Sequence, residues 1–140
     1  MAPNVLTWTP DIAVGVEVID AQHQSLFSLY NRLASALEAQ ISVEELELAM
    51  LSLQDYVIEH FAEEQELMAE SRYPDFNKHA IQHDRFIVDF LKLKRRLTAE
   101  GASRQIAEEL KERVGNWLLS HISVVDRQFA TFYRAQRGAE

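Results

Sequence analysis

All five histidines of this 140-residue chain fall on the apolar seams of helical repeats, where a core residue is expected, and two carboxylates share those seams. Each polar group taken from water costs free energy unless a partner satisfies it, so an ordinary core does not bury such a set. A metal ion satisfies imidazole and carboxylate groups together. The sequence therefore predicts a metal site with the donors His23, His60, Glu64, His79, His83, His121 and Asp126.

Two pairs of these donors have the spacing with which one helix can hold one ion. His60 and Glu64 are four residues apart, and so are His79 and His83. This spacing stacks two side chains on one helical face. A single pair is weak evidence, because exposed pairs are common and a lone buried histidine is more often a satisfied core residue. Two pairs on adjacent helices, with no histidine left for the surface, favour the metal.

The number of donors indicates two ions rather than one. Tetrahedral zinc takes about four ligands, whereas two roughly octahedral ions such as iron offer about twelve positions. Five imidazoles, two bridging carboxylates and a bridging oxide or hydroxide would fill all but about one of these positions. The set has fewer carboxylates than ferritin-like sites, which favours reversible uptake of oxygen over cleavage of its O–O bond. The absence of cysteine excludes iron–sulfur ligation and thiol catalysis.

The spacing of His121 and Asp126 is irregular. Five residues of a regular α-helix turn by about 500°, which would leave the two side chains about 140° apart. Both can face one pair of ions only if the helix is locally widened, as in a π-bulge. The alternative is that Asp126 is a surface residue and that Val124 or Val125 continues the seam. The spacing alone does not decide between the two.

Four amphipathic segments position these donors, each with apolar residues at alternating spacings of three and four. One stripe of each segment faces inward over several turns, which is the geometry of helices packed in a bundle. The seams run over His23–Leu37, Leu46–Leu67, His79–Leu97 and Leu110–Tyr133.

Capping and breaking residues mark the ends of these helices. Ser42 followed by Glu45 is a signature of a helix N-terminus, and Pro74 breaks the chain between the second and third helices. Gly101 with Ser103 ends the third helix and begins the fourth. Such short connections make neighbouring helices antiparallel. We therefore predict an all-α protein, an antiparallel up-down-up-down four-helix bundle.

We expect a single domain over residues 1–140, with a non-helical N-terminal arm over 1–18 and the bundle over about 19–135. Trp8 of the arm is expected to pack on the bundle. The net charge of −8 argues against binding to nucleic acid, and the basic residues between 92 and 96 make only a local edge. No stretch approaches the about 20 apolar residues of a membrane-spanning helix, and the start has no signal-peptide pattern. These observations predict a cytoplasmic monomer that is not embedded in a membrane.

Short stretches along the chain form a pattern whose separate parts are weak but whose order and spacing together are specific. They are Trp8, Val14–Val16, Ile19–Asp20, Gln22–His23, His60–Phe61, Glu63–Glu64, Leu67–Met68, Tyr73–Pro74, His79, His83, Phe86, Trp117–Leu118, His121–Ile122 and Asp126. On these residues the chain resembles the bacterial hemerythrins over nearly its whole length, and it departs from their pattern at no ligand position.

The resemblance to the bacteriohemerythrins implies two iron ions, bridged by oxide or hydroxide, that bind dioxygen reversibly without haem. It implies an oxygen carrier rather than an enzyme, with an oxygen-consuming enzyme as a partner, and a sensor or a di-iron oxidase or peroxidase as the alternative. The open position would be on the iron with two histidines, beside an apolar pocket of Trp117, Leu118 and Ile122. One iron would take His79, His83 and His121, the other would take His23 and His60, and Glu64 and Asp126 would bridge them.

Metal-bound histidines usually donate their second N–H to a carboxylate or carbonyl group. Asp20, Gln22 and Glu63 are the candidates for this role, because they lie close to His23 or His60 along a helix. Tyr30, on the first seam, has two interpretations: it caps a polar group inside the bundle, or it packs plainly with its hydroxyl group reaching solvent. We favour the second.

Overall fold

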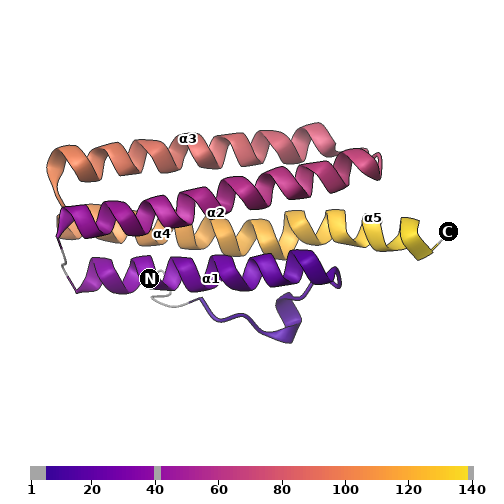
Figure 1. The fold of residues 1–140 in the computed structure, drawn as a ribbon, viewed down its shortest axis with the longest axis horizontal. Helices are drawn as coiled ribbons and strands as arrows, with labels where there is room; N and C mark the ends of the chain where they lie inside the picture. Colours follow the sequence, from indigo (N-terminus) through magenta and orange to yellow (C-terminus); the bar gives the residue numbers. More distant parts are fainter. Residues whose placement is uncertain (1–5, 40–41, 139–140) are drawn as a thin grey trace.

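The helices of the chain lie side by side in one antiparallel bundle (Figure 1). The computed structural model describes residues 6–39 and 42–138. Around the bundle, α1 packs against α2 and α4, and α3 packs against α2 and α4. This arrangement confirms the predicted up-down-up-down four-helix topology. The helices are α1 (Glu17–Glu38), α2 (Val43–Glu70), α3 (Phe76–Glu100), α4 (Arg104–Ser120) and α5 (Arg127–Gly138).

The fourth rod of the bundle is one continuous helix with a widened turn inside it. A π-helix over His121–Asp126 joins α4 to α5, and the two α-helices follow one line (Figure 1). This is the local widening that the five-residue spacing of His121 and Asp126 requires. The structure also excludes the alternative, because Asp126 is fully buried whereas Val124 is 53% exposed.

The helix ends carry the predicted caps. The Ser42 hydroxyl accepts a hydrogen bond from the Glu45 N–H at 3.2 Å, and the Ser103 hydroxyl accepts one from the Ile106 N–H at 3.2 Å. Gly101 ends α3 with a φ of 83°, a left-handed conformation that glycine adopts at little cost. These caps satisfy backbone groups that have no partner inside their helices.

The N-terminal arm differs in part from its prediction. It contains a 3₁₀ turn over Pro10–Ile12, and α1 already begins at Glu17, so residues 17 and 18 belong to the bundle. At the other end α5 continues to Gly138, beyond the expected 135. Trp8 packs against the core as expected. Residues 1–5 of the expected arm lie outside the described residues.

The Asp20 carboxylate forms hydrogen bonds with the N-terminal arm rather than with a histidine of the predicted metal site. It accepts hydrogen bonds from the backbone N–H groups of Val14, at 2.8 Å, and Gly15, at 3.2 Å. Asp20 lies in the first turn of α1, where an acid also interacts favourably with the helix dipole. Asp20 was one of the candidates for supporting a histidine, and this candidate was wrong, because the N–H groups of Val14 and Gly15 occupy both of its carboxylate oxygens.

Two apolar clusters fill the bundle on either side of a polar layer. The larger cluster includes Leu26, Val57 and Ile122, and the smaller one includes Ile19 and Phe129. Along each helix the predicted metal donors fall between members of the two clusters. Met68 takes the core position that the seam assigned to Leu67, which is only half-buried. The fold thus places a polar layer inside an otherwise apolar core.

Tyr30 contradicts the favoured interpretation, because its side chain is fully buried, and it follows the alternative, in which it caps a polar group inside the bundle. Its hydroxyl donates to the backbone carbonyl of Lys111 in α4 at 3.0 Å. Gly115 makes this contact possible: a Cβ atom at position 115 would lie 2.6 Å from the Tyr30 hydroxyl oxygen. A tyrosine at this position therefore joins α1 to α4 only because the facing residue has no side chain.

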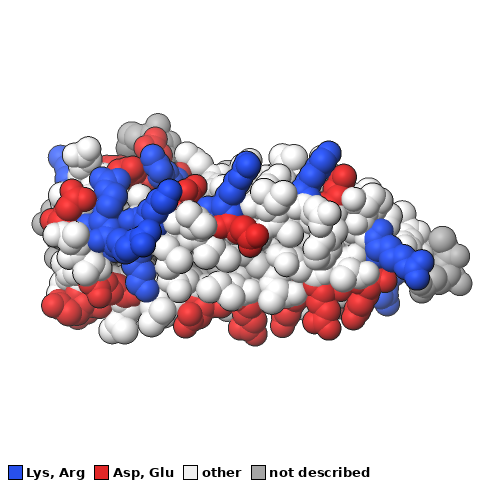
Figure 2. Space-filling view, turned by 90° about the horizontal axis from the view of Figure 1, so that it is seen from above, with Lys and Arg blue, Asp and Glu red and all other residues white. Residues whose placement is uncertain are grey.

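Charged residues are distributed unevenly over the surface. Lysine and arginine gather over the C-terminal end of α3, while acidic residues follow one edge of the same face (Figure 2). The basic residues have local partners: Lys94 donates to Gln54, and Arg96 pairs with Glu100 and Glu109. Among the helices of residues 6–39 and 42–138, none combines the length and the apolar character that crossing a membrane requires.

Candidate metal centre

All the predicted donors meet in the polar layer between the two apolar clusters. Each of the donor residues is at most 3% exposed. They come from α1, α2, α3 and both ends of the π-helix, so the site exists only in the folded bundle. Their potential ligand atoms form two groups, one containing His79, His83 and His121 and the other containing His23 and His60, with Glu64 and Asp126 common to both.

The three-histidine group brings imidazole nitrogens very close together. His121 Nε2 lies 3.2 Å from His79 Nε2 and 3.1 Å from His83 Nε2. Two cis ligands of one metal, with bonds of about 2.0–2.1 Å, are separated by about 3 Å. The three nitrogens therefore converge on a common point with spacings that suit ligands of one ion.

The two-histidine group lies on the other side of the carboxylates. His23 Nε2 is 2.8 Å from Asp126 Oδ2. His60 Nε2 is 3.8 Å from the same oxygen and 3.7 Å from Glu64 Oε2. This group is more open than the first, since its second histidine lies beyond hydrogen-bond distance of either carboxylate.

Each carboxylate divides its two oxygens between the groups. Glu64 Oε1 is 2.7 Å from His79 Nε2, whereas Glu64 Oε2 faces His60. Asp126 Oδ1 is 2.9 Å from His121 Nε2, whereas Asp126 Oδ2 faces His23. This is the arrangement in which a carboxylate can bridge two ions.

Unpaired buried atoms show that the site fits a cation. His60 Nε2 and Glu64 Oε2 are buried and have no hydrogen-bond partner among the described residues. Leaving such atoms unpaired costs about 1–3 kcal/mol each, and more for a charged group. A positive ion between the two atoms would remove this cost, and the imidazole and carboxylate donors suit iron, zinc or manganese.

Comparisons with known proteins agree with this geometry. A family model described as "Hemerythrin HHE cation binding domain" matches residues 14–133. The chain belongs to the hemerythrin family. A bacteriohemerythrin of Stenotrophomonas maltophilia is 32% identical over 133 residues, covering 94% of this chain and 83% of the relative. A hemerythrin-like protein of Naegleria gruberi is 32% identical over 127 residues, covering 91% and 92%. A crystal structure of wild-type hemerythrin superposes with a TM-score of 0.78 at 27% identity, covering 91% of this chain and 97% of that one.

Three glutamines orient histidines of this hemerythrin site. Each lies next to a predicted donor on its own helix and accepts the Nδ1–H of a histidine on the following helix, which leaves Nε2 free to face the site. Only Gln22 was among the predicted candidates. Gln65 and Gln82 could have been found in the sequence because each is the chain neighbour of a donor. Neighbouring residues of a helix point about 100° apart, so a residue beside a donor faces an adjacent helix. The pairs are Gln22 with His60 (2.6 Å), Gln65 with His83 (2.9 Å) and Gln82 with His121 (3.3 Å).

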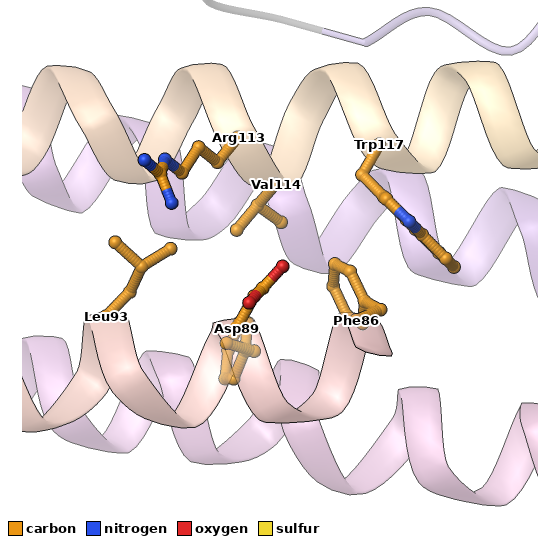
Figure 3. Close-up of a pocket in the computed structure, with 7 residues that line it drawn as sticks. Phe86, Asp89, Leu93, Arg113, Val114 and Trp117 are labelled. Atoms are coloured by element: carbon orange, nitrogen blue, oxygen red, sulfur yellow. The ribbon is translucent and has the colours of Figure 1, made fainter. Parts of the chain in front are cut away.

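Aromatic rings cover the three-histidine side of the hemerythrin site. Phe61 stacks on His83 with ring centroids 3.7 Å apart and an interplanar angle of 4°. Trp117 stacks on His121 at 4.3 Å and 11°. Trp117 also forms the end of a cavity of about 260 Å³ between α3 and α4, shown in Figure 3. The cavity is lined by Phe86, Asp89, Phe90, Leu93, Arg113, Val114 and Trp117.

The other two residues of the predicted oxygen pocket, Leu118 and Ile122, are each 1% exposed and lie in the larger apolar cluster. Trp117 is only half-buried, and the ring contacts that the structure shows for it join it to Phe61, Phe86 and His121. Trp117 is therefore placed against the three-histidine group, away from the two-histidine group.

Burial and mutual charges shift the titration of the site. Burial and the charge of Asp126 raise the pKa of Glu64 to about 7. Burial and the charges of His121 and His79 lower the pKa of His83 to about 2. Burial also lowers the pKa of His79, but hydrogen bonds to Asp126 and Glu64 outweigh it and raise that pKa to about 9. At neutral pH the metal-free site thus keeps a proton on His79, beside the carboxylates, where a cation would be stabilised.

Proposed function

We propose that the chain holds a non-haem di-iron centre and binds dioxygen reversibly, for storage, transport or delivery to an oxygen-using enzyme. The observation that carries the proposal is the division of the Glu64 and Asp126 oxygens between a three-histidine and a two-histidine group. Two positions joined by shared carboxylates suit a pair of ions. The difference of one histidine leaves one position with room for a small molecule.

The roles of the donors follow from their groups. His79, His83 and His121 would hold one iron, His23 and His60 the other, and Glu64 and Asp126 would bridge them, together with an oxide or hydroxide. The iron pair would supply the electrons and the open coordination position that dioxygen needs. Membership of the hemerythrin family supports iron over manganese, which the donor types alone would also accept.

Residues around the donors support a carrier rather than an enzyme. Every histidine of the chain is already a proposed ligand, so no imidazole is left to act as a general acid toward a bound substrate. Leu118 and Ile122 are proposed to keep water away from the two-histidine position, because access of water and protons would promote irreversible oxidation. Trp117 and Phe61 would shield the other position.

The proposal extends to the organisation of the protein. Residues 1–140 would form one hemerythrin domain that acts as a monomer in the cytoplasm. Light scattering in solution tests the first part, since a monomer has a mass of 16.1 kDa. Cell fractionation tests the second.

Anaerobic reconstitution with Fe(II), followed by optical spectra through repeated cycles of oxygen and argon, tests the function. We expect about two irons per chain and a coloured band that appears with oxygen and disappears on purging. The variant Asp126→Ala, which removes one of the two shared carboxylates, should not show the band. A band that forms once and never reverts, or that decays with release of hydrogen peroxide, would contradict the carrier and indicate a sensor or an oxidase.

A further inference from the structure

A surface carboxylate is connected to the two-histidine group through a single glutamine. Gln22 of α1 accepts a hydrogen bond from His60 Nδ1 at 2.6 Å through its Oε1, and its Nε2 donates to the Glu63 carboxylate of α2. His60 is 2% exposed, whereas Glu63 lies on the surface. Gln22 and Glu63 both line a surface cleft of about 330 Å³ between the two helices. The buried metal-site residue His60 is thus connected to the exposed charge of Glu63 through one side chain, that of Gln22.

The carboxylate determines the direction of this hydrogen-bond chain. A glutamine amide can present either its oxygen or its nitrogen to a neighbour. An ionised carboxylate only accepts hydrogen bonds, so Glu63 can hold only the NH₂ end of Gln22. The amide oxygen must then face His60, and an oxygen requires the N–H of His60 to be on Nδ1. The unprotonated Nε2 is left to point into the metal site.

In the described part of the chain, the three-histidine group has no equivalent of Glu63. Gln65 and Gln82 accept from His83 and His121 in the same way. Within residues 6–39 and 42–138, however, neither of these two amides donates to a carboxylate. Among the described residues, a negative charge therefore supports the glutamine of the two-histidine group alone. The other member of that group, His23, has no partner on Nδ1 in the same part of the chain.

We propose that Glu63 and Gln22 are positioning residues for the two-histidine position: they fix the tautomer and orientation of His60 and strengthen it as an electron donor. The inference about electron donation to iron rests on the proposed function. The inference about metal affinity does not, because any divalent ion at that position needs His60 Nε2 unprotonated. Partners that orient metal ligands in this way typically contribute about 10- to 100-fold to metal affinity.

The test compares variants at two exposed positions, Glu63 and Glu66. Glu66 is exposed, lies on the same side of α2 and lines the same cleft, but it makes no hydrogen bond to Gln22. Glu66→Gln therefore removes the same charge as Glu63→Gln without affecting the chain of hydrogen bonds. Gln22→Leu removes the acceptor of His60, and Gln65→Leu removes the corresponding acceptor in the three-histidine group.

Anaerobic titration with Fe(II), repeated with Zn(II), gives the first readout. We expect Gln22→Leu to weaken the binding of the weaker of the two ions by about tenfold, Glu63→Gln to weaken it several-fold, and Glu66→Gln to change it by less than about twofold. Gln65→Leu should weaken the binding of the other ion instead. Equal effects of Glu63→Gln and Glu66→Gln, or no effect of Gln22→Leu, would overturn the proposal.

The second readout separates positioning from a general structural role. In the zinc-loaded protein, the NMR chemical shift of the His60 Nδ1 proton should change in Glu63→Gln and should be unchanged in Glu66→Gln. In the iron-loaded protein, Glu63→Gln should raise the reduction potential, because a less polarised imidazole stabilises Fe(III) less. Unchanged signals and potentials in Glu63→Gln would overturn the inference. If the protein binds two ions but never binds oxygen reversibly, the proposed function fails while the zinc data still decide this proposal.

Discussion

Asp126 Oδ1 lies 2.9 Å from His121 Nε2, although Asp126 follows His121 by five positions on the same helix. A regular α-helix would point their side chains about 140° apart. The π-helix over His121–Asp126 adds one residue to the turn and brings both side chains to the same face. Because Asp126 is thereby directed into the bundle, its second oxygen reaches His23 of α1.

This widened turn leads to a prediction about deletions. Removing Val124, which is 53% exposed, leaves His121 and Asp126 four residues apart, a spacing that an ordinary α-helix keeps on one face. We expect the deletion variant to fold and to bind metal. Removing the exposed Asn116 from α4 instead rotates the metal-site residues by about 100° relative to the preceding core residues, and metal binding should be lost. Metal content after dialysis compares the two. Loss of metal in both would show that the widened turn itself is required.

The contact between Tyr30 and Gly115 predicts a steric effect on stability. Gly115→Ala places a Cβ atom 2.6 Å from the tyrosine hydroxyl oxygen, so one of the two helices must move. Overpacking of this kind costs about 1–3 kcal/mol of unfolding free energy. Gly138→Ala is the control, because a Cβ atom there meets nothing within 4 Å. Urea denaturation of both variants measures the difference, and equal stabilities would refute the clash.

The raised pKa of His79 predicts how the metal-free protein responds to pH. Its pKa is 6.5 in the unfolded chain and about 9 in the folded one. Folding therefore takes up a proton between these values, and this contribution to stability is full below pH 6.5 and is lost as the pH rises through 9. We expect the melting temperature of the metal-free protein to fall from pH 6.5 to pH 9. His79→Gln should flatten this dependence. If the melting temperature of His79→Gln depends on pH as strongly as that of the wild type, groups other than His79 cause the dependence.

Metal removal should reveal a conflict between function and stability at Glu64. This carboxylate is 1% exposed, and burial contributes to the rise of its pKa to about 7. A carboxyl group whose pKa is raised by folding is less favourable in its ionised form in the folded chain than in the unfolded chain, so ionised Glu64 lowers the stability of the metal-free protein above pH 7. Glu64→Leu should therefore be more stable than the metal-free wild type and should bind no metal pair. Thermal unfolding with and without Zn(II) tests both parts. A less stable metal-free variant would contradict the expected cost of this carboxylate.

Features that depend on the helical period were predictable from the sequence. The caps at Ser42 and Ser103 are local, because each involves residues three apart on one chain segment. The burial of His60 with Glu64, and of His79 with His83, follows from a four-residue spacing on apolar seams. The period of an α-helix is set by its own backbone hydrogen bonds, so such patterns can be recognised without knowledge of the neighbouring helices.

Contacts between helices were decided only by the tertiary structure. The division of the Glu64 and Asp126 oxygens between two groups depends on how far each helix is rotated and shifted against the next. The same is true of Gln65 and Gln82, which orient histidines on other helices, and of Tyr30, whose burial requires the absence of a side chain at Gly115. Side-chain packing across the bundle sets these rotations, and one seam pattern is compatible with several of them. The sequence therefore determined which residues enter the polar layer, and the packing of the helices determined which atoms meet there.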